Sequence, residues 1–189
     1  YVYINQGLSY WLENSKSVEV QIFEMGFGTG MNAYLSYIFS MQQELSIDYV
    51  SIEKFPLSQN EIESLKMKET LPEAQYLHFF DQLHKLEWNS INRVSNFTFQ
   101  KIKGDFFEMK FRQDFDVLFY DAFGYHAQSE MWGEKALEIC FNLLKPGGLW
   151  VSYCAKGQVR RNLEKVGFSV ERLEGPPGKR EMLRAIKLV

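Results

Sequence analysis

The 189-residue sequence predicts an α/β protein with a mostly parallel seven-stranded sheet, one antiparallel strand near the C-terminus, and helices on both faces. Two observations predict this class. Short apolar runs rich in β-branched and aromatic residues alternate with longer segments of helical periodicity, as in strands joined by helical crossovers. The last two apolar runs are separated only by a Gly-Pro-Pro-Gly turn at 175–178, which indicates a hairpin at the sheet edge.

The predicted strands are short and bounded by turn residues. They cover 20–25, 47–52, 97–102, 115–120, 149–154, 168–173 and 182–188. Residues 1–4 are also apolar, and we expect them to continue a strand from further N-terminal residues. We expect residues 1–189 to form one domain.

The predicted helices lie between these strands and carry apolar residues at helical spacing. They cover 31–41, 58–66, 72–86, 131–144 and 158–166. Ser58 and Glu61 have the spacing of a capping box at the start of the second helix. Lys145-Pro146-Gly147-Gly148 and Gly167 stop the last two helices.

The composition excludes several classes of protein. The hydrophobic fraction of 46% and charged fraction of 24% are ordinary globular values, and no apolar run approaches the length of a membrane-spanning helix. Two cysteines, Cys140 and Cys154, are too few for a four-ligand zinc site or a disulfide framework. We expect no metal, no membrane partner and a reducing cytoplasm.

The net charge of −3 conceals an asymmetry along the chain. Residues 156–187 contain nine Lys or Arg against four Glu, a local charge of +5, and the rest of the chain carries −8. A basic C-terminal surface on an acidic body can contact nucleic-acid phosphates. A scattered, solvated charge surface is the alternative.

A glycine-rich loop follows the first predicted strand. The residues Glu24-Met25-Gly26-Phe27-Gly28-Thr29-Gly30 run from that strand into the helix over 31–41. Glycines allow a tight turn and a close approach of a ligand, and the helix N-terminus lies at the carboxyl edge of the sheet. The dinucleotide pattern requires glycine where Met31 stands, which disfavours a nicotinamide oxidoreductase.

Acidic residues end the next two strands. Glu53 closes the second strand, 23 residues after Gly30, where an acid is suited to ribose hydroxyls. Gly104-Asp105 closes the third strand, and its carboxylate is placed to accept a hydrogen bond from the exocyclic amine of adenine. A solvated strand-end acid is the alternative for each.

These features in order, together with Pro-Gly-Gly before the fifth strand, resemble the class I S-adenosylmethionine methyltransferases, which have a Rossmann-like fold. In that topology the end of the fourth strand lies beside the transferable methyl group. Asp121 stands there, and a carboxylate suits a nitrogen nucleophile, because methyl transfer develops positive charge on the attacking amine. We expect Asp121 to accept a hydrogen bond and orient the amine first, and to act as a general base second. A helix N-cap is the structural alternative.

Four aromatic residues cluster near the two site loops: Phe27, Phe123, Tyr125 and Trp132. Aromatic rings at a loop rim can stack on an unpaired base. Because 16% of the chain is aromatic, packing in the core is an equally good reading of each. The three histidines show no metal-ligand pattern.

A more specific resemblance rests on five blocks. They are 23–32 around Gly-Phe-Gly-Thr-Gly, 51–57 around Glu53, 121–123 with Met131-Trp132, 159–168 from Val-Arg-Arg to Gly-Phe, and 178–183 with Lys-Arg-Glu-Met-Leu. In this order they resemble the methyltransferase domain of the bacterial tRNA 5-methylaminomethyl-2-thiouridine biosynthesis proteins, the MnmC/MnmD type. The loop 124–127 lacks the proline common in that family.

The resemblance implies an enzyme that uses S-adenosyl-L-methionine to methylate the 5-aminomethyl group of (2-thio)uridine at the tRNA wobble position. The cofactor-binding residues would be Glu24, Gly26, Phe27, Gly28, Thr29, Gly30, Asn32, Glu53, Lys54 and Asp105, and the catalytic residue would be Asp121. The substrate-binding residues would be Phe123, Tyr125, Trp132, Arg160, Arg161, Lys179 and Arg180. The implied partners are the tRNA anticodon loop and a separate enzyme that produces the amine.

Two rival functions stay open at this point. One is a methyltransferase for another amine, in a small molecule or a protein. The other is a non-catalytic relative that only binds RNA, against which the intact Glu53 and Asp121 argue.

Overall fold

A computed structural model describes residues 1–110 and 114–188. Those residues form one sheet of eight strands in the order β3-β4-β2-β1-β5-β6-β8-β7. The strands are β1 (Glu19–Met25), β2 (Ser46–Glu53), β3 (Ile91–Val94), β4 (Phe97–Lys103), β5 (Phe115–Tyr120), β6 (Leu144–Ser152), β7 (Phe168–Glu174) and β8 (Glu181–Lys187). Strands β4, β2, β1, β5 and β6 are parallel neighbours.

The predicted antiparallel strand is β8, which pairs antiparallel with both β6 and β7. The prediction of seven strands was one short. Strand β3 pairs antiparallel with β4 at the other edge of the sheet. Its four residues alternate between exposed and half-buried, so it lacks the continuous apolar run that marks a buried strand.

The helices are α1 (Tyr10–Asn14), α2 (Met31–Gln43), α3 (Gln59–Ser64), α4 (Leu77–Lys85), α5 (Glu134–Leu143) and α6 (Gly157–Val166). Shorter helical turns are η1 (Ile4–Ser9), η2 (Met67–Glu69), η3 (Ala74–Tyr76) and η4 (Ser129–Trp132). Helix α3 begins with the predicted capping box between Ser58 and Glu61. Helix α4 starts later than expected, because Glu73 is in the left-handed region at φ 58° and only a 3₁₀ turn precedes Leu77.

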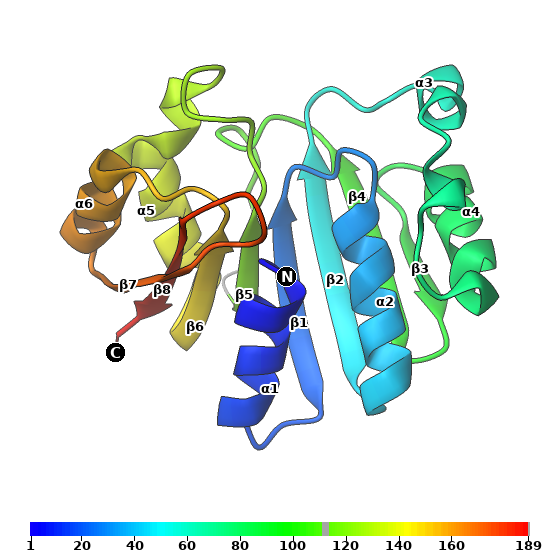
Figure 1. The fold of residues 1–189 in the computed structure, drawn as a ribbon, viewed down its shortest axis with the longest axis horizontal. Coiled ribbons are helices and arrows are strands. Elements are labelled where there is room, and N and C mark those ends of the chain that lie inside the picture. The colour runs from blue at the N-terminus through cyan, green and yellow to red at the C-terminus, as the bar shows by residue number, and fades with distance from the viewer. Residues whose placement is uncertain (111–113, 189) are drawn as a thin grey trace.

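The sheet separates two apolar cores, and helices therefore cover both of its faces. Alternate strand residues divide between the cores: Ile22 and Phe119 face one, Phe23 and Leu118 the other. The first core also holds residues of α1, α2 and α4, and the second holds residues of α5 and α6. Figure 1 shows α1 and α2 on the near face of the sheet.

The N-terminal segment departs from its prediction. Residues 1–4 do not form a strand, and the chain enters a helical turn at Ile4 that leads into α1. Val2, Tyr3 and Leu8 are buried in the first core, which explains why the sequence there is as apolar as a strand. The N-terminus lies in front of the centre of the sheet (Figure 1), so Tyr3 is within reach of the carboxyl end of β5.

Candidate active site

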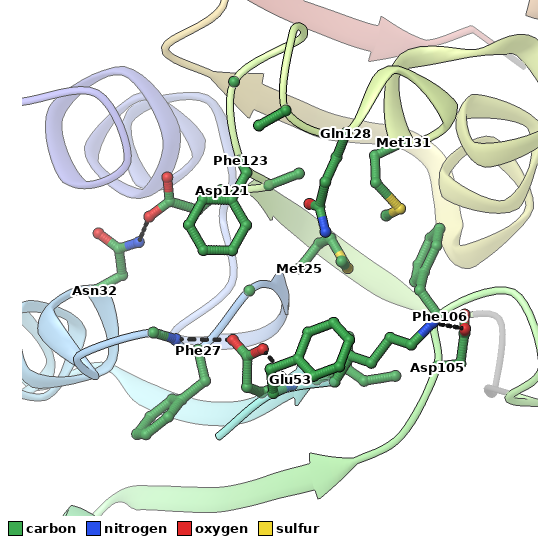
Figure 2. Close-up of a pocket in the computed structure, with 18 of the residues that line it drawn as sticks. Met25, Phe27, Asn32, Glu53, Asp105, Phe106, Asp121, Phe123, Gln128 and Met131 are labelled. Atoms are coloured by element: carbon green, nitrogen blue, oxygen red, sulfur yellow. Dashed lines mark hydrogen bonds and ion pairs between the residues drawn. The ribbon is translucent and has the colours of Figure 1, made fainter. Parts of the chain in front are cut away.

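A cavity of about 670 Å³ opens at the carboxyl ends of β1, β2, β4 and β5. Its walls come from five parts of the chain that are far apart in sequence: the glycine loop with the start of α2, residues 52–55, residues 104–107, residues 121–131, and Tyr153. Figure 2 shows Asp121 and Asn32 at one end of the cavity, Asp105 and Phe106 at the other, and Glu53 between them.

Two glycines of the loop have no room for a side chain. Gly26 has φ +93°, and a Cβ there would lie 2.6 Å from the carbonyl oxygen of Asp121. Gly30 has φ +73°, and its Cβ would lie 2.8 Å from the ring of Phe27. Both positions therefore require glycine. Gly28 faces open space, and its backbone N–H donates to Glu53 Oε2 at 3.1 Å, which joins the loop to the end of β2.

Glu53 and Asp105 lie on the cavity wall and are held by backbone N–H groups. Glu53 Oε1 accepts from Phe55 N at 2.8 Å, and Asp105 Oδ1 accepts from Phe107 N at 2.9 Å. Lys54 Nζ lies 2.6 Å from Asp105 Oδ2. This hydrogen bond from Lys54, together with the one from Phe107, lowers the pKa of Asp105 and keeps it ionised.

Asp121 follows β5 and is held by two side chains. Tyr3 donates its hydroxyl to Oδ1 at 2.8 Å, and Asn32 donates its amide to Oδ2 at 3.0 Å. Burial raises the pKa of Asp121, while the hydrogen bonds from Tyr3 and Asn32 and the charge of Lys179 lower it in part. The result is an oriented, largely dehydrated carboxylate at one end of the cavity.

Glu24 does not line this cavity and is completely buried behind it. Its Oε1 accepts from the amide of Asn32 at 3.0 Å, and its Oε2 accepts from the hydroxyl of Ser51 at 2.6 Å. Burial raises the pKa of Glu24 to about 8, against hydrogen bonds from Ser51 and Asn32 that lower it. Asn32 thus bridges two carboxyl groups, of which Glu24 is mostly protonated at neutral pH.

The four candidate aromatic residues divide into two kinds. Phe123 is 65% exposed at the cavity wall. Tyr125 is half-buried and lines a second cavity, which lies between residues 124–127, 153–156 and 179–181. Phe27 and Trp132 are buried, as the core-packing alternative has it: Phe27 packs edge-on against Trp88, and Trp132 Nε1 donates to the carbonyl of Phe123 at 2.9 Å. Phe27 also lines the first cavity and Trp132 the second, so each residue supports a site loop and forms part of a cavity wall.

The four candidate basic residues also divide. Lys179 and Arg180 line the second cavity, next to Tyr125. Arg160 and Arg161 lie on α6, where Arg160 pairs with Glu164 at 3.6 Å and Arg161 donates to Gln158. The two α6 residues line neither of these cavities.

Several residues at the cavity were not predicted from the sequence. Phe106 and Tyr153 line the cavity from the carboxyl ends of β4 and β6. Their positions just after predicted strands could have identified them as cavity residues. Gln128 lies on the loop after Asp121 and points toward the cavity (Figure 2). No local sequence pattern indicated a role for Tyr3 at the cavity, because Tyr3 and Asp121 are 118 residues apart in the chain.

Among the described residues, no helix is long and apolar enough to cross a membrane. Within the same residues, no group of three or more His, Cys, Asp or Glu could hold a metal ion.

A family model described as S-adenosyl-L-methionine-dependent methyltransferase matches residues 63–188. The chain is 28% identical over 188 residues to the tRNA 5-methylaminomethyl-2-thiouridine biosynthesis bifunctional protein MnmC of Marinomonas sp., covering 94% of this chain and 27% of that protein. It is 31% identical over 170 residues to the protein of the same name in Ectopseudomonas mendocina, covering 86% and 26%. The chain therefore spans about a quarter of the length of these relatives.

The fold is similar to that of a solved structure. A crystal structure of MnmC2 from Aquifex aeolicus matches with a TM-score of 0.72 at 24% sequence identity, covering 93% of this chain and 55% of that one. At this identity the match concerns the fold, and the class I methyltransferase fold expected from the sequence is confirmed.

Proposed function

This chain belongs to the S-adenosyl-L-methionine-dependent methyltransferases, and from that premise we propose that it methylates the 5-aminomethyl group of (2-thio)uridine at the wobble position of tRNA. The product is 5-methylaminomethyl-(2-thio)uridine. Residues 1–189 act as one methyltransferase domain.

The cavity fits the cofactor in size and in donor set. Its volume of about 670 Å³ lies within the range of about 300–1,000 Å³ usual for small-ligand sites. Gly28 leaves open space for a ligand, and Thr29 and Lys54 line the same wall. Glu53 would accept hydrogen bonds from the ribose hydroxyls, and Asp105 would accept one from the adenine amine. When bound, S-adenosyl-L-methionine supplies an electrophilic methyl group on a sulfonium.

Glu24 and Gly30 do not line the cavity and act on the cofactor indirectly, whereas Gly26 and Phe27 line it. Gly26 and Gly30 permit the loop conformation, and Phe27 packs behind it. Glu24 reaches the site only through Asn32. Glu24 and the two glycines therefore shape the cavity, and Phe27 forms part of its wall.

Asp121 receives the substrate amine. A partly buried carboxylate attracts the positive charge that develops on the nitrogen during transfer, and it does so more strongly than a fully solvated one. Tyr3 and Asn32 fix both of its oxygens, so the amine meets an acceptor of defined direction. Burial raises the pKa of Asp121 and so improves it as a proton acceptor.

The tRNA substrate is proposed from the relatives, whose printed names state tRNA 5-methylaminomethyl-2-thiouridine biosynthesis. The Asp121 site supports an amine as the reacting group. An earlier modification step, carried out by an amine-producing enzyme, must supply that amine. The reaction takes place where mature tRNA is modified, in the cytoplasm.

The observation that carries this proposal is the doubly held Asp121 in the same cavity as Glu53 and Asp105. The test is transfer of labelled methyl from S-adenosyl-L-methionine to tRNA that carries 5-aminomethyluridine, followed by mass spectrometry of the nucleosides. We expect 5-methylaminomethyluridine from the wild type and little or none from Asp121→Ala, while calorimetry shows the cofactor still bound.

The matched control is Asp48→Asn, which removes an exposed carboxylate at the opposite end of β2 and should change neither activity nor cofactor binding. Transfer to polyamines or peptides but not to tRNA would overturn the substrate. Equal loss of cofactor binding and turnover in Asp121→Ala would make Asp121 a structural residue.

A further inference from the structure

A second cavity of about 590 Å³ adjoins the first. It lies between residues 124–127, residues 153–156 after β6, and residues 179–181 at the start of β8. Gly124, Ala127 and Tyr153 line both cavities. A ligand in the second cavity is therefore a direct neighbour of a ligand in the first.

The second cavity carries three positive charges that form no salt bridge among the described residues, although the charge of Lys179 also acts on Asp121 from a distance. Lys156, Lys179 and Arg180 line it, and in the described part of the chain no carboxylate lies within ion-pair distance of any of them. Glu181 is the one acid in its lining, and it pairs with Arg172 at 3.4 Å. Unpaired cations that gather at a cavity favour an anionic ligand.

The two lysines are held against aromatic rings. Lys156 Nζ lies 4.2 Å from the ring centroid of Tyr125, and Lys179 Nζ lies 3.9 Å from that of Tyr153. The hydroxyl of Tyr153 donates to the carbonyl of Ala122 at 2.8 Å, so that ring is fixed to the segment next to Asp121. Ammonium groups beside aromatic rings match the two chemical parts of an unpaired nucleotide, its phosphate and its base.

We propose that the second cavity binds the nucleotide next to the one that is methylated. Its phosphate lies against Lys156, Lys179 and Arg180, and its base contacts the rings of Tyr125 and Tyr153. Tyr153, shared by both cavities, then separates the neighbouring nucleotide from the reacting one. This inference rests on the proposed function, since it needs a single-stranded RNA segment as substrate.

The test measures binding of an anticodon stem-loop as a function of salt concentration. We expect the double variant Lys156→Ala with Lys179→Ala to bind about tenfold more weakly or worse. Its slope of log Kd against log salt should be smaller by up to about 0.7, because the two lysines contact one phosphate and each phosphate neutralised on a single strand contributes about 0.7. Calorimetry with S-adenosyl-L-methionine shows whether the variant is folded.

The matched control is Lys165→Ala. Lys165 belongs to the same basic segment but lies on α6 beside Glu134, outside both cavities. Each cavity lysine is also replaced singly, as Lys156→Ala and as Lys179→Ala. If the stem-loop affinity falls as much in the control as in these single variants, only net charge matters and the second cavity is not the site. If the wild type methylates tRNA and the double variant binds the stem-loop as tightly as the wild type does, this inference alone is overturned. A wild type that methylates no tRNA overturns the proposed function itself.

Discussion

Replacing Glu24 by Gln should remove a large pH dependence from the stability of this protein. Glu24 is completely buried, and its pKa rises from 4.5 to about 8 on folding. A carboxyl group whose pKa is raised in the folded state destabilises the fold as pH rises from the unfolded value to the folded one. The loss therefore begins near pH 4.5 and is complete above about pH 8.

The magnitude follows from the size of this window. One pKa unit corresponds to about 1.36 kcal/mol, so the change from 4.5 to about 8 amounts to about 5 kcal/mol, of which about 3 kcal/mol has been lost at pH 7. Gln has the same shape and stays neutral, and Ser51 can accept from its amide. The variant should match the wild type near pH 4.5 and exceed it increasingly toward pH 8.

Urea unfolding at intervals of pH between 5 and 8 measures this difference directly. Equal m-values for the wild type and the variant would show that both expose the same surface on unfolding. Glu13→Gln, which neutralises an exposed acid on α1, is the control and should show little difference at any pH. Parallel stability curves for the wild type and Glu24→Gln would refute the reasoning. Glu24→Gln should also retain cofactor affinity, and a large loss would mean that Glu24 contacts the cofactor.

Three further predictions concern single side chains. Tyr3→Phe should move the acidic limb of the pH–kcat profile to higher pH, because Asp121 loses a hydrogen-bond donor that lowers its pKa. The control is Tyr34→Phe, which removes a hydroxyl that donates to the carbonyl of Pro72 and should leave the profile unchanged. An unmoved limb in Tyr3→Phe would contradict the role given to its hydroxyl. Burial lowers the pKa of Lys101 from 10.5 to about 8, so wild-type stability should rise with pH above 8, and unfolding of Lys101→Met should lack that rise. Glu53→Ala should weaken S-adenosyl-L-methionine binding by about 1.5–3 kcal/mol in calorimetry, as loss of a hydrogen bond to a charged group does, and unchanged affinity would remove Glu53 from the cofactor site.

Local patterns determined most of the fold and the side of the cavity that holds the glycine loop and the two strand-end acids. The glycine loop, Glu53 and Asp105 each stand at the end of a predicted strand, and parallel strands bring their carboxyl ends to one edge. The capping box at Ser58 was predictable for the same reason, since both partners lie within one turn of helix. Asp121 could be placed because its strand is a buried apolar run.

Tertiary structure alone decided what surrounds those residues. The sequence identified Glu24 as an acid of the glycine motif, but only the path of β1 turns its side chain away from the cavity and toward Ser51. Tyr3 looked like strand, and its hydroxyl meets Asp121 because the N-terminal turn packs across the sheet. Sequence periodicity reports which faces are apolar, whereas burial and contacts between distant segments set the direction of a side chain and its pKa. That is why the residue types of this site could be predicted and their partners could not.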